Sequence, residues 1–405
     1  FHPTNTNYFL AGAQDNGSHK FTNAGLSTTS EVTGGDGAFV HIDQDDPTYQ
    51  FTSYVFNNYR RSLNGGTTWG NVNVNNSGQF INTTDYDNTN FKLYAPNTTT
   101  SYLRWDDPRT GATFVSVPVS LNNNIVSAVK VSPYTSNLVY MGTDDYNSGA
   151  YGGTCRLLKI ANAHTATPTV TSIKSASMPV AGVTVSCINT GTNDNNLITC
   201  FSNYGVQQIW ISTDGGTNWT NIDGDLPDMP VRWCMFVPGT NNTKAIIATE
   251  AGVYLTQLIN GASTAWIPSP TFPTVRTDML QLRPSDGLVA AATHGRGLWT
   301  QPYISILPAN NFFFFFAWNG SKVALELEYT PLATGATLDI ELSADATNFA
   351  KVGSLSVATG IKYNFNHTPN ANNVYYRIRS NEKNGVIKYS NTVKLFKTGA
   401  GNGLE

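Results

Sequence analysis

Aspartates are the residues of this chain whose type and position come closest to catalytic chemistry. Hydrolysis of a glycosidic bond uses two carboxyl groups, one as general acid and one as general base. We take Asp36, Asp144 and Asp278 as the catalytic candidates, and Asp36 stands apart because a glycine flanks it on each side. The competing interpretation of each aspartate is a cap of a turn or a strand end. The full set, all expected in loops or at strand ends, is Asp36, Asp43, Asp85, Asp144, Asp145 and Asp278.

Aromatic residues could bind a glycan by stacking on its sugar rings. Trp105, Trp233, Tyr59 and Tyr146 are the binding candidates, placed where they could line a rim. The alternative is that these rings pack inside the protein, since large aromatic side chains contribute most when buried.

Other catalytic chemistries have less support in the sequence. Several arginines late in the chain could grip a substrate carboxylate, as in sialidases, but the Arg-Ile-Pro element of that family is absent. The histidines are isolated, with no serine or cysteine nucleophile motif beside them. The arginines are Arg232, Arg276, Arg283 and Arg296, and the histidines are His19, His41 and His294.

Metal and disulfide chemistry rests on two short segments. Asp223, Asp225 and Asp228 could supply oxygens to a structural Ca²⁺, although they lack the order of an EF-hand loop; otherwise we expect no metal site and no cofactor. No CxxC pair indicates zinc among Cys155, Cys187, Cys200 and Cys234. Cys187 and Cys200 lie symmetrically about the Asn193-Asp194 turn, so they could form a disulfide across a hairpin. The alternative is that all four cysteines are small buried apolar residues.

Two octapeptides share the form Ser-x-Asp/Asn-Gly-Gly-x-x-Trp and indicate the kind of scaffold that positions these candidates. In such a turn a short amide or carboxylate bonds its own backbone, the glycines supply positive φ, and the Trp covers the turn. The form is similar to the Asp-box, a hairpin turn between the two outer strands of a β-propeller blade, so we assign these residues a structural role. They are Ser62, Asn64, Gly65, Gly66 and Trp69 in the first copy, and Ser212, Asp214, Gly215, Gly216 and Trp219 in the second.

A weaker turn motif, seen for example at residues 46–51 and 132–138, recurs every 40 to 55 residues or so, the length of a four-stranded blade. Counting its copies gives seven units. The first unit lacks most of its inner strand and the last has three evident strands. Phe1 opens within a repeat without Met or a signal peptide, so we expect a piece of a longer precursor whose missing N-terminal segment could close the ring.

The pattern of apolar and polar residues changes after Pro308. Five phenylalanines, Phe312 to Phe316, precede strands that alternate apolar and polar residues, as in an antiparallel sandwich of the fibronectin III kind. Neighbours in a strand alternate faces, so we expect the phenylalanines to be packed between the two domains; the alternative is an exposed patch that binds a ligand. The expected domains are residues 1–305, 306–398 and a linker, 399–405.

Longer segments resemble known families. Residues 11–17, 34–39 and 293–297, together with the octapeptides, resemble Asp-box (BNR-repeat) propellers of the sortilin and xyloglucanase type. Residues 340–349, 375–378 and 389–391 are similar to the module that precedes the sorting domain in bacterial type IX secretion substrates, except that Leu342 stands where that family usually has Arg. This resemblance implies export by the type IX machinery, removal of a sorting domain after the linker, and release or attachment at the outer-membrane surface.

Composition agrees with an extracellular all-β protein. Only 13% of the residues are charged and the net charge is -3, with no basic stripe, so nucleic acid is excluded as a partner. No apolar run approaches the roughly 18 residues of a transmembrane segment.

From the repeats and strand patterns we expect an all-β chain, a seven-bladed β-propeller followed by a small antiparallel β-sandwich. Its expected role is binding or structural, towards a glycan or partner protein; the alternative is a xyloglucanase-type glycoside hydrolase with paired aspartates, although such enzymes use two propellers.

Overall fold

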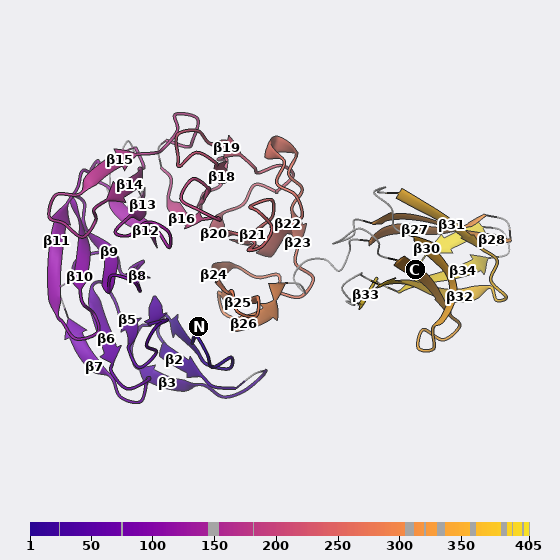
Figure 1. Cartoon of the computed structure of the whole chain (residues 1–405), viewed down its shortest axis with the longest axis horizontal. Coiled ribbons are helices and arrows are strands. Elements are labelled where there is room, and N and C mark those ends of the chain that lie inside the picture. Colours follow the sequence, from indigo (N-terminus) through magenta and orange to yellow (C-terminus); the bar gives the residue numbers. More distant parts are fainter. Residues whose placement is uncertain are drawn as a thin grey trace. The chain divides into compact units, whose positions relative to one another are not determined.

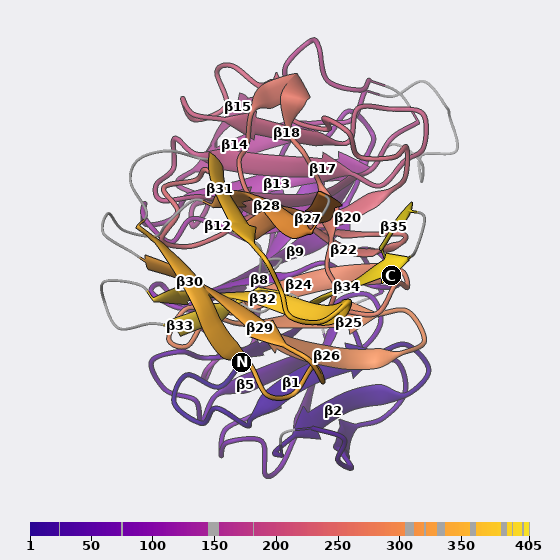
Figure 2. The same cartoon turned by 90° about the vertical axis from the view of Figure 1, so that its right-hand side faces the viewer.

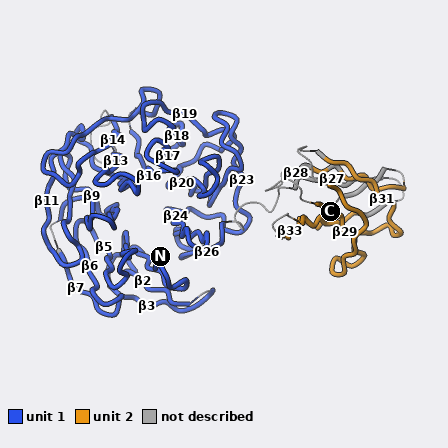
Figure 3. Tube along the Cα trace, in the orientation of Figure 1, with its two compact units in different colours: residues 1–303 blue, residues 304–405 orange. Residues whose placement is uncertain are grey.

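Short strands joined by polar turns build both parts of the chain. The computed structural model describes residues 1–23, 25–73, 76–144, 154–180, 182–303, 312–319, 321–329, 337–356, 362–381, 387–390, 392–398 and 401–404. The chain divides into two compact units, unit 1 (Phe1–Tyr303) and unit 2 (Ile304–Glu405) (Figure 3). In the described part of the chain, no helix has the length and apolar character needed to cross a membrane.

Consecutive antiparallel strands form each sheet of unit 1. Among the described residues, five four-stranded sheets stand between a three-stranded sheet at each end of the unit. The sheets are β1 (Phe9–Ala13), β2 (Gly17–Phe21) and β3 (Ser30–Thr33); β4 (Val40–Ile42), β5 (Gln50–Ser53), β6 (Asn58–Ser62) and β7 (Gly70–Asn73); β8 (Asp85–Asp87), β9 (Lys92–Thr98), β10 (Ser101–Asp106) and β11 (Thr113–Pro118); β12 (Ile125–Val131), β13 (Val139–Asp144), β14 (Leu157–Ala161) and β15 (Thr169–Ser172); β16 (Val185–Thr190), β17 (Leu197–Phe201), β18 (Ile209–Ser212) and β19 (Thr220–Asn221); β20 (Val231–Phe236), β21 (Ala245–Thr249), β22 (Gly252–Thr256) and β23 (Ile267–Pro268); and β24 (Thr277–Arg283), β25 (Leu288–Thr293) and β26 (Gly297–Pro302).

The sheets of unit 1 follow one another around a ring (Figure 1). The first strand of each complete sheet, called the inner strand below, lies nearest the centre, and the fourth lies at the outside. Every residue of the second strands β5, β13, β17 and β21 is buried, whereas the outer strand β15 is largely exposed. A strand covered on both faces by neighbouring sheets requires a continuous apolar run, which explains Leu-Ile-Thr-Cys-Phe in β17 and Ala-Ile-Ile-Ala-Thr in β21.

Neighbouring sheets meet at the end where their inner strands begin. We call this end of the ring the start face; it comprises the turns before the inner strands and the turns between second and third strands. The contacts that join one sheet to the next there include Asp15 N to Asp36 Oδ1 (2.9 Å), Phe56 N to Phe80 O (3.1 Å), Gln79 Nε2 to Val126 O (3.3 Å), Thr184 Oγ1 to Asp144 Oδ1 (2.9 Å) and Ser186 Oγ to Val231 O (2.6 Å).

The last sheet of unit 1 contacts the first. Arg283, at the end of β24, donates a hydrogen bond from Nη1 to the carbonyl of Thr6 at 3.0 Å. Its guanidinium also lies over the rings of Phe1 and Phe9, with distances of 5.1 and 5.5 Å to the ring centroids. Because these partners are 277 positions apart in the chain, Arg283 joins the two ends of the ring.

The two octapeptides form turns between the third and fourth strands of their sheets, and we call them the repeated turns. In the second, Ser212 Oγ donates to Asp214 Oδ1 at 2.8 Å and accepts from Gly216 N at 2.9 Å, while Asn218 N donates to Asp214 at 2.8 Å. Gly215 and Gly216 have φ of 72° and 93°. The first turn repeats the circuit with Ser62, Asn64, Gly66 and Thr68. Trp219 Nε1 donates to Ile173 O at 2.7 Å, whereas Trp69 Nε1 is buried without an acceptor in the described part.

Ser212→Ala should destabilise unit 1 by about 1–3 kcal/mol, because the buried hydroxyl is the acceptor for the Gly216 amide and the donor to Asp214. Denaturant unfolding followed by Trp fluorescence measures the loss. The matched control is Thr213→Ala, since Thr213 is the adjacent exposed residue of the same turn. Equal stability of the two variants would show that the serine circuit contributes nothing.

The described residues of unit 2 form two antiparallel sheets (Figure 2), and buried side chains of both sheets belong to one core. Buried Val323, Leu325 and Leu327 come from the first sheet, and Ile340 and Tyr376 are among their partners from the second. The first sheet is β27 (Phe312–Asn319), β28 (Lys322–Tyr329) and β31 (Lys362–His367). The second is β30 (Ala350–Ser356), β29 (Thr337–Ser343), β32 (Asn373–Asn381), β34 (Val393–Thr398) and β35 (Gly401–Leu404), with β33 (Ile387–Tyr389) on β32.

Three details of unit 2 bear on the sequence predictions. The phenylalanine run forms β27 and pairs with β28; its side chains lie outside the described residues. Residues Gly401–Leu404, which we expected in a linker, pair with β34 as β35. A turn after β29 also repeats the serine circuit: Ser343 Oγ donates to Asp345 Oδ1 at 2.8 Å, and Asn348 N donates to the same oxygen at 2.8 Å.

Candidate functional face

Four inner strands open with a β-bulge on the start face. In each, one residue has no partner on the second strand, so its side chain leaves the alternation of the sheet. Bulges re-aim side chains in this way and are frequent beside functional sites. The bulged residues are Ser127 in β12, Ser186 in β16, Arg232 in β20 and Asp278 in β24.

The two bulged serines link their sheets to the next. Ser127 Oγ donates to Val185 O at 2.7 Å, and Ser186 Oγ donates to Val231 O at 2.6 Å. Both acceptors are the first residues of the following inner strand. The serines therefore tie sheets together, and the charged residues at the two remaining bulges depart from this pattern.

Arg232 and Asp278 belong to a four-residue ion cluster. Arg232 Nη2 lies 2.5 Å from Glu250 Oε2, and its Nε lies 3.7 Å from Asp278 Oδ1. Arg276 Nε donates to the same Asp278 oxygen at 2.9 Å. The exposed fraction of these four side chains runs from 22% to 41%, so the cluster is open to solvent. Two guanidinium groups and two carboxylates balance in charge.

The catalytic candidates lie on this face, each held by a different neighbour. Asp36 accepts the backbone N–H of Asp15, and Asp144 accepts the hydroxyl of Thr184. Asp278 is engaged by the arginines of the ion cluster. Of the other aspartates considered, Asp85 accepts the Val131 amide at 2.8 Å, Asp43 is buried elsewhere, and Asp145 lies outside the described residues.

The aromatic candidates differ from one another in burial. Trp105 and Tyr59 are completely buried and pack against each other at a tilt, with ring centroids 5.5 Å apart, so neither can contact a glycan. This expectation was wrong, because both rings fill the core between the sheets of β4–β7 and β8–β11. Tyr146 lies outside the described residues. Trp233 is partly exposed and contacts Phe39, whose sheet is not its neighbour in the ring, with centroids 6.5 Å apart. Trp233 Nε1 is buried and has no acceptor in the described part.

A depression that the sequence did not point to lies on the same face. Its lining includes Phe80 and Ile81 before β8, Thr99 in the β9–β10 turn, and Asn123 before β12. Phe80 is 45% exposed. Nothing in the local sequence separates this phenylalanine from a core residue, since exposure depends on which turn of the neighbouring sheet faces it.

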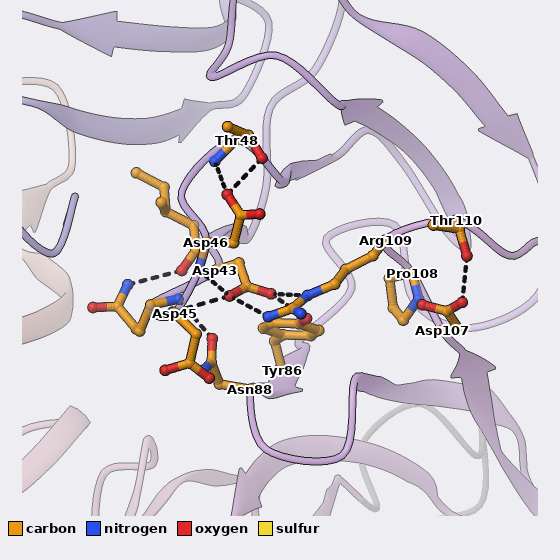
Figure 4. Close-up of polar contacts among 12 residues, drawn as sticks. Asp43, Asp45, Asp46, Thr48, Tyr86, Asn88, Asp107, Pro108, Arg109 and Thr110 are labelled. Atoms are coloured by element: carbon orange, nitrogen blue, oxygen red, sulfur yellow. Dashed lines mark hydrogen bonds and ion pairs between the residues drawn. The ribbon is translucent and has the colours of Figure 1, made fainter.

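Among the described residues, the carboxylate with the most hydrogen bonds lies at the opposite end of the ring. Asp43 is fully buried, and Arg109 donates to both of its oxygens, from Nε at 2.6 Å and Nη2 at 2.7 Å (Figure 4). Tyr86 Oη donates at 2.7 Å, and the amides of Asp45 and Asp46 each donate at 3.0 Å. Burial acts to raise the pKa of Asp43, but these hydrogen bonds outweigh it and lower the pKa. A carboxylate with all its lone pairs engaged joins two sheets and is unsuited to catalysis.

Solved structures of other proteins are similar to this chain in fold. A chain of the mitotic checkpoint complex aligns with 73% of this chain and 84% of its own length, at 12% identity and a TM-score of 0.53. The WD40 propeller domain of Doa1 aligns with 73% of this chain and 89% of its own, at 13% identity and a TM-score of 0.52. Unit 1 is a β-propeller. A GH74 enzyme from Niastella koreensis aligns with 96% of this chain and 64% of its own, at 17% identity and a TM-score of 0.49. No protein-family model and no curated protein matches the chain.

The aspartates considered for calcium lie in one segment between β19 and β20, but each bonds a different part of the propeller. Asp223 accepts the amides of Gln208 and Ile209, Asp225 accepts that of Trp266, and Asp228 accepts that of Gly205. Burial raises the pKa of Asp223. Within the described ranges, no three His, Cys, Asp or Glu side chains are grouped to hold a metal ion.

All four cysteines are free thiols and buried. Cys187 and Cys200 are register partners on β16 and β17, as the symmetry of the sequence about its turn indicates. Cys187 also reaches the next inner strand, with its Sγ 3.5 Å from Cys234 O. The three thiols belong to one apolar cluster, so in this structure they act as small core residues.

Proposed function

We propose that this chain is a secreted or outer-membrane-surface binding protein that engages a glycan or an extracellular protein through the start face. In this proposal unit 1 is a seven-bladed Asp-box propeller of the sortilin or xyloglucanase-like type, and unit 2 is a fibronectin III-like sandwich of a type IX secretion substrate. Seven successive sheets and the hydrogen-bonded repeated turns support the first assignment. Two sheets around one core support the second.

The observation that carries the binding role is the engagement of the start-face carboxylates. Asp278 and Glu250 both contact Arg232, and Arg276 bonds Asp278 as well. Glycoside hydrolysis instead requires one carboxylic acid that gives its proton to the leaving group and a second that faces it across the substrate. A face of balanced charges, amides and exposed apolar side chains is suited to recognition by many modest contacts.

A glycan array run beside hydrolysis assays on the full chain tests the proposal. We expect retention of a glycan, or of an extracellular protein in a parallel pull-down, with no release of new reducing ends. Turnover that disappears in Asp278→Asn would support the glycoside hydrolase instead. Absence of both retention and turnover would contradict a binding role. Thr213→Ala, on an exposed turn away from the start face, serves as the control variant.

A further inference from the structure

The described residues that line the depression on the start face carry no charged side chain. It lies between the sheet of β8–β11 and the sheet of β12–β15, where residues 78–81 lead into β8 and Asn123 and Ile125 stand at the start of β12. Thr99, from the turn between β9 and β10, contributes to the same lining. The ion cluster of Arg232 lies on other sheets of the ring. The depression therefore offers a ligand apolar contact and hydrogen bonds, and no ion pair.

Phe80 gives the depression an aromatic platform. Its side chain is 45% exposed, so the face of the ring is accessible to a ligand. Phe56 packs against it in a T-shaped arrangement, with centroids 5.9 Å apart and the rings at 86°. The backbone is fixed as well, since Phe56 N donates to Phe80 O at 3.1 Å. The ring is thus held in place before any ligand arrives.

Polar groups beside the ring are available for hydrogen bonds. The side chains of Thr99 and Asn123 have no hydrogen-bond partner among the described residues. Gln79 uses its amide N–H towards Val126 O, at 3.3 Å. Asn124 lies in the chain between the lining residues Asn123 and Ile125. Its buried Oδ1 lacks a donor in the described part of the chain. Buried acceptors are nearly always paired, so this turn is short of one donor.

Hydrogen bonds hold the turns that build the depression. Gly78 N donates to Asn97 O at 2.7 Å, and Gln79 N donates to Oδ1 of the fully buried Asn82 at 3.0 Å. Asn124 N closes the other side on Leu121 O at 3.1 Å. A site whose walls are already bonded loses little conformational entropy when a ligand binds.

We propose that this depression is a subsite for one neutral sugar residue of a glycan, stacked on Phe80 and hydrogen-bonded through Asn123, Thr99 and Gln79. A pyranose ring presents an apolar C–H face and a rim of hydroxyls, which matches one exposed aromatic ring flanked by amides and a hydroxyl. No described residue of the lining is a cation, which disfavours uronic and sialic acids, whose carboxylates bind arginine best. The inference rests on the proposed function, because it specifies the glycan that the start face would take.

The test is a printed array carrying neutral fragments of β-glucan, mannan, xylan and chitin beside anionic fragments of galacturonan and sialylated chains. The full chain is compared with Phe80→Ala, Phe80→Tyr and Asn123→Ala. We expect neutral fragments to be retained, with the apparent affinity lowered about tenfold or more by Phe80→Ala and only a few-fold by Asn123→Ala. Phe80→Tyr should stay within about threefold of the wild type, because it keeps the aromatic face.

Tyr204→Ala is the matched control, since Tyr204 is an exposed aromatic residue in the β17–β18 turn of the same face, outside the depression. Coincident thermal unfolding of the variants excludes loss of fold as the cause. Retention of neutral fragments that is unchanged in Phe80→Ala would overturn the subsite and leave the proposed function standing. Preference for anionic fragments would overturn the subsite as well. Retention of an extracellular protein and of no glycan would overturn the subsite while supporting the broader binding role.

Discussion

Arg109→Ala should lower the free energy of unfolding by about 3–5 kcal/mol. The substitution leaves the Asp43 carboxylate buried, with no exposed surface, and removes two of its shortest hydrogen bonds. Tyr86 and two backbone amides remain, but they supply no positive charge. The guanidinium also covers the ring of Phe91, with 3.6 Å to the centroid, so its loss exposes apolar surface too. Denaturant unfolding of the full chain at neutral pH measures the change.

The same ion pair makes stability depend on pH. Burial alone would raise the pKa of Asp43, but the bonds from Arg109, Tyr86 and the backbone outweigh it and lower the pKa below its ordinary value of about 4. A depressed pKa stabilises the fold above the unfolded value, and this stabilisation is lost as pH falls towards the folded value. The wild type should therefore lose stability below about pH 4 through this group. On acidification, Arg109→Ala should begin to unfold at a higher pH than the wild type does.

Arg60→Ala is the control for both measurements. Arg60 is a partly exposed arginine of the same propeller that bonds a backbone carbonyl at 3.3 Å and has no carboxylate partner in the described part. Its loss should cost less than about 1 kcal/mol. The double change Arg109→Met with Asp43→Asn should recover part of the loss, since it removes the uncompensated charge. An Arg109→Ala variant as stable as Arg60→Ala would contradict a structural role for the pair.

The sequence predicts the repeating elements well, because their causes are local. The prediction of an all-β chain with four-stranded antiparallel sheets is confirmed, as is the β-propeller fold. Glycines with positive φ and a serine that bonds its own turn are recognisable in a single octapeptide. The boundary expected at residue 305 lies two positions from the end of unit 1 at Tyr303.

Features made between sheets could not be predicted. Asp43 and Arg109 are 66 residues apart and share no motif, so only the packing of two turns brings them together. The fate of Trp105 depends on the neighbouring sheet, which closes over it, and alternation alone does not distinguish a core ring from a rim ring. A bulge depends on the partner strand as well, which is why Arg232 and Asp278 could not be recognised as equivalent positions.

Gly12→Ala should lower the free energy of unfolding by about 3 kcal/mol or more. A Cβ at Gly12 would lie 2.0 Å from the carbonyl oxygen of Ala38 and 2.5 Å from its nitrogen, and both are backbone atoms that cannot rotate away. The φ of Gly12 is not in the left-handed region, so the cost is steric. The first two sheets touch backbone to backbone here, with Gly37 N donating to Ala13 O at 2.9 Å.

Room for the new methyl group requires these two sheets to separate, which breaks that bond and the one from Asp15 N to Asp36. The close contact therefore explains Gly12 and Gly37, one glycine from each of the segments 11–17 and 34–39, and places Asp36 where the two sheets meet. Gly70→Ala is the matched control, because its φ is likewise not left-handed and its added Cβ would have its nearest neighbour, Arg61 O, at 4.0 Å. It should change stability by less than about 0.5 kcal/mol. Equal unfolding free energies for the two variants in denaturant would show that the sheets do not approach this closely in solution.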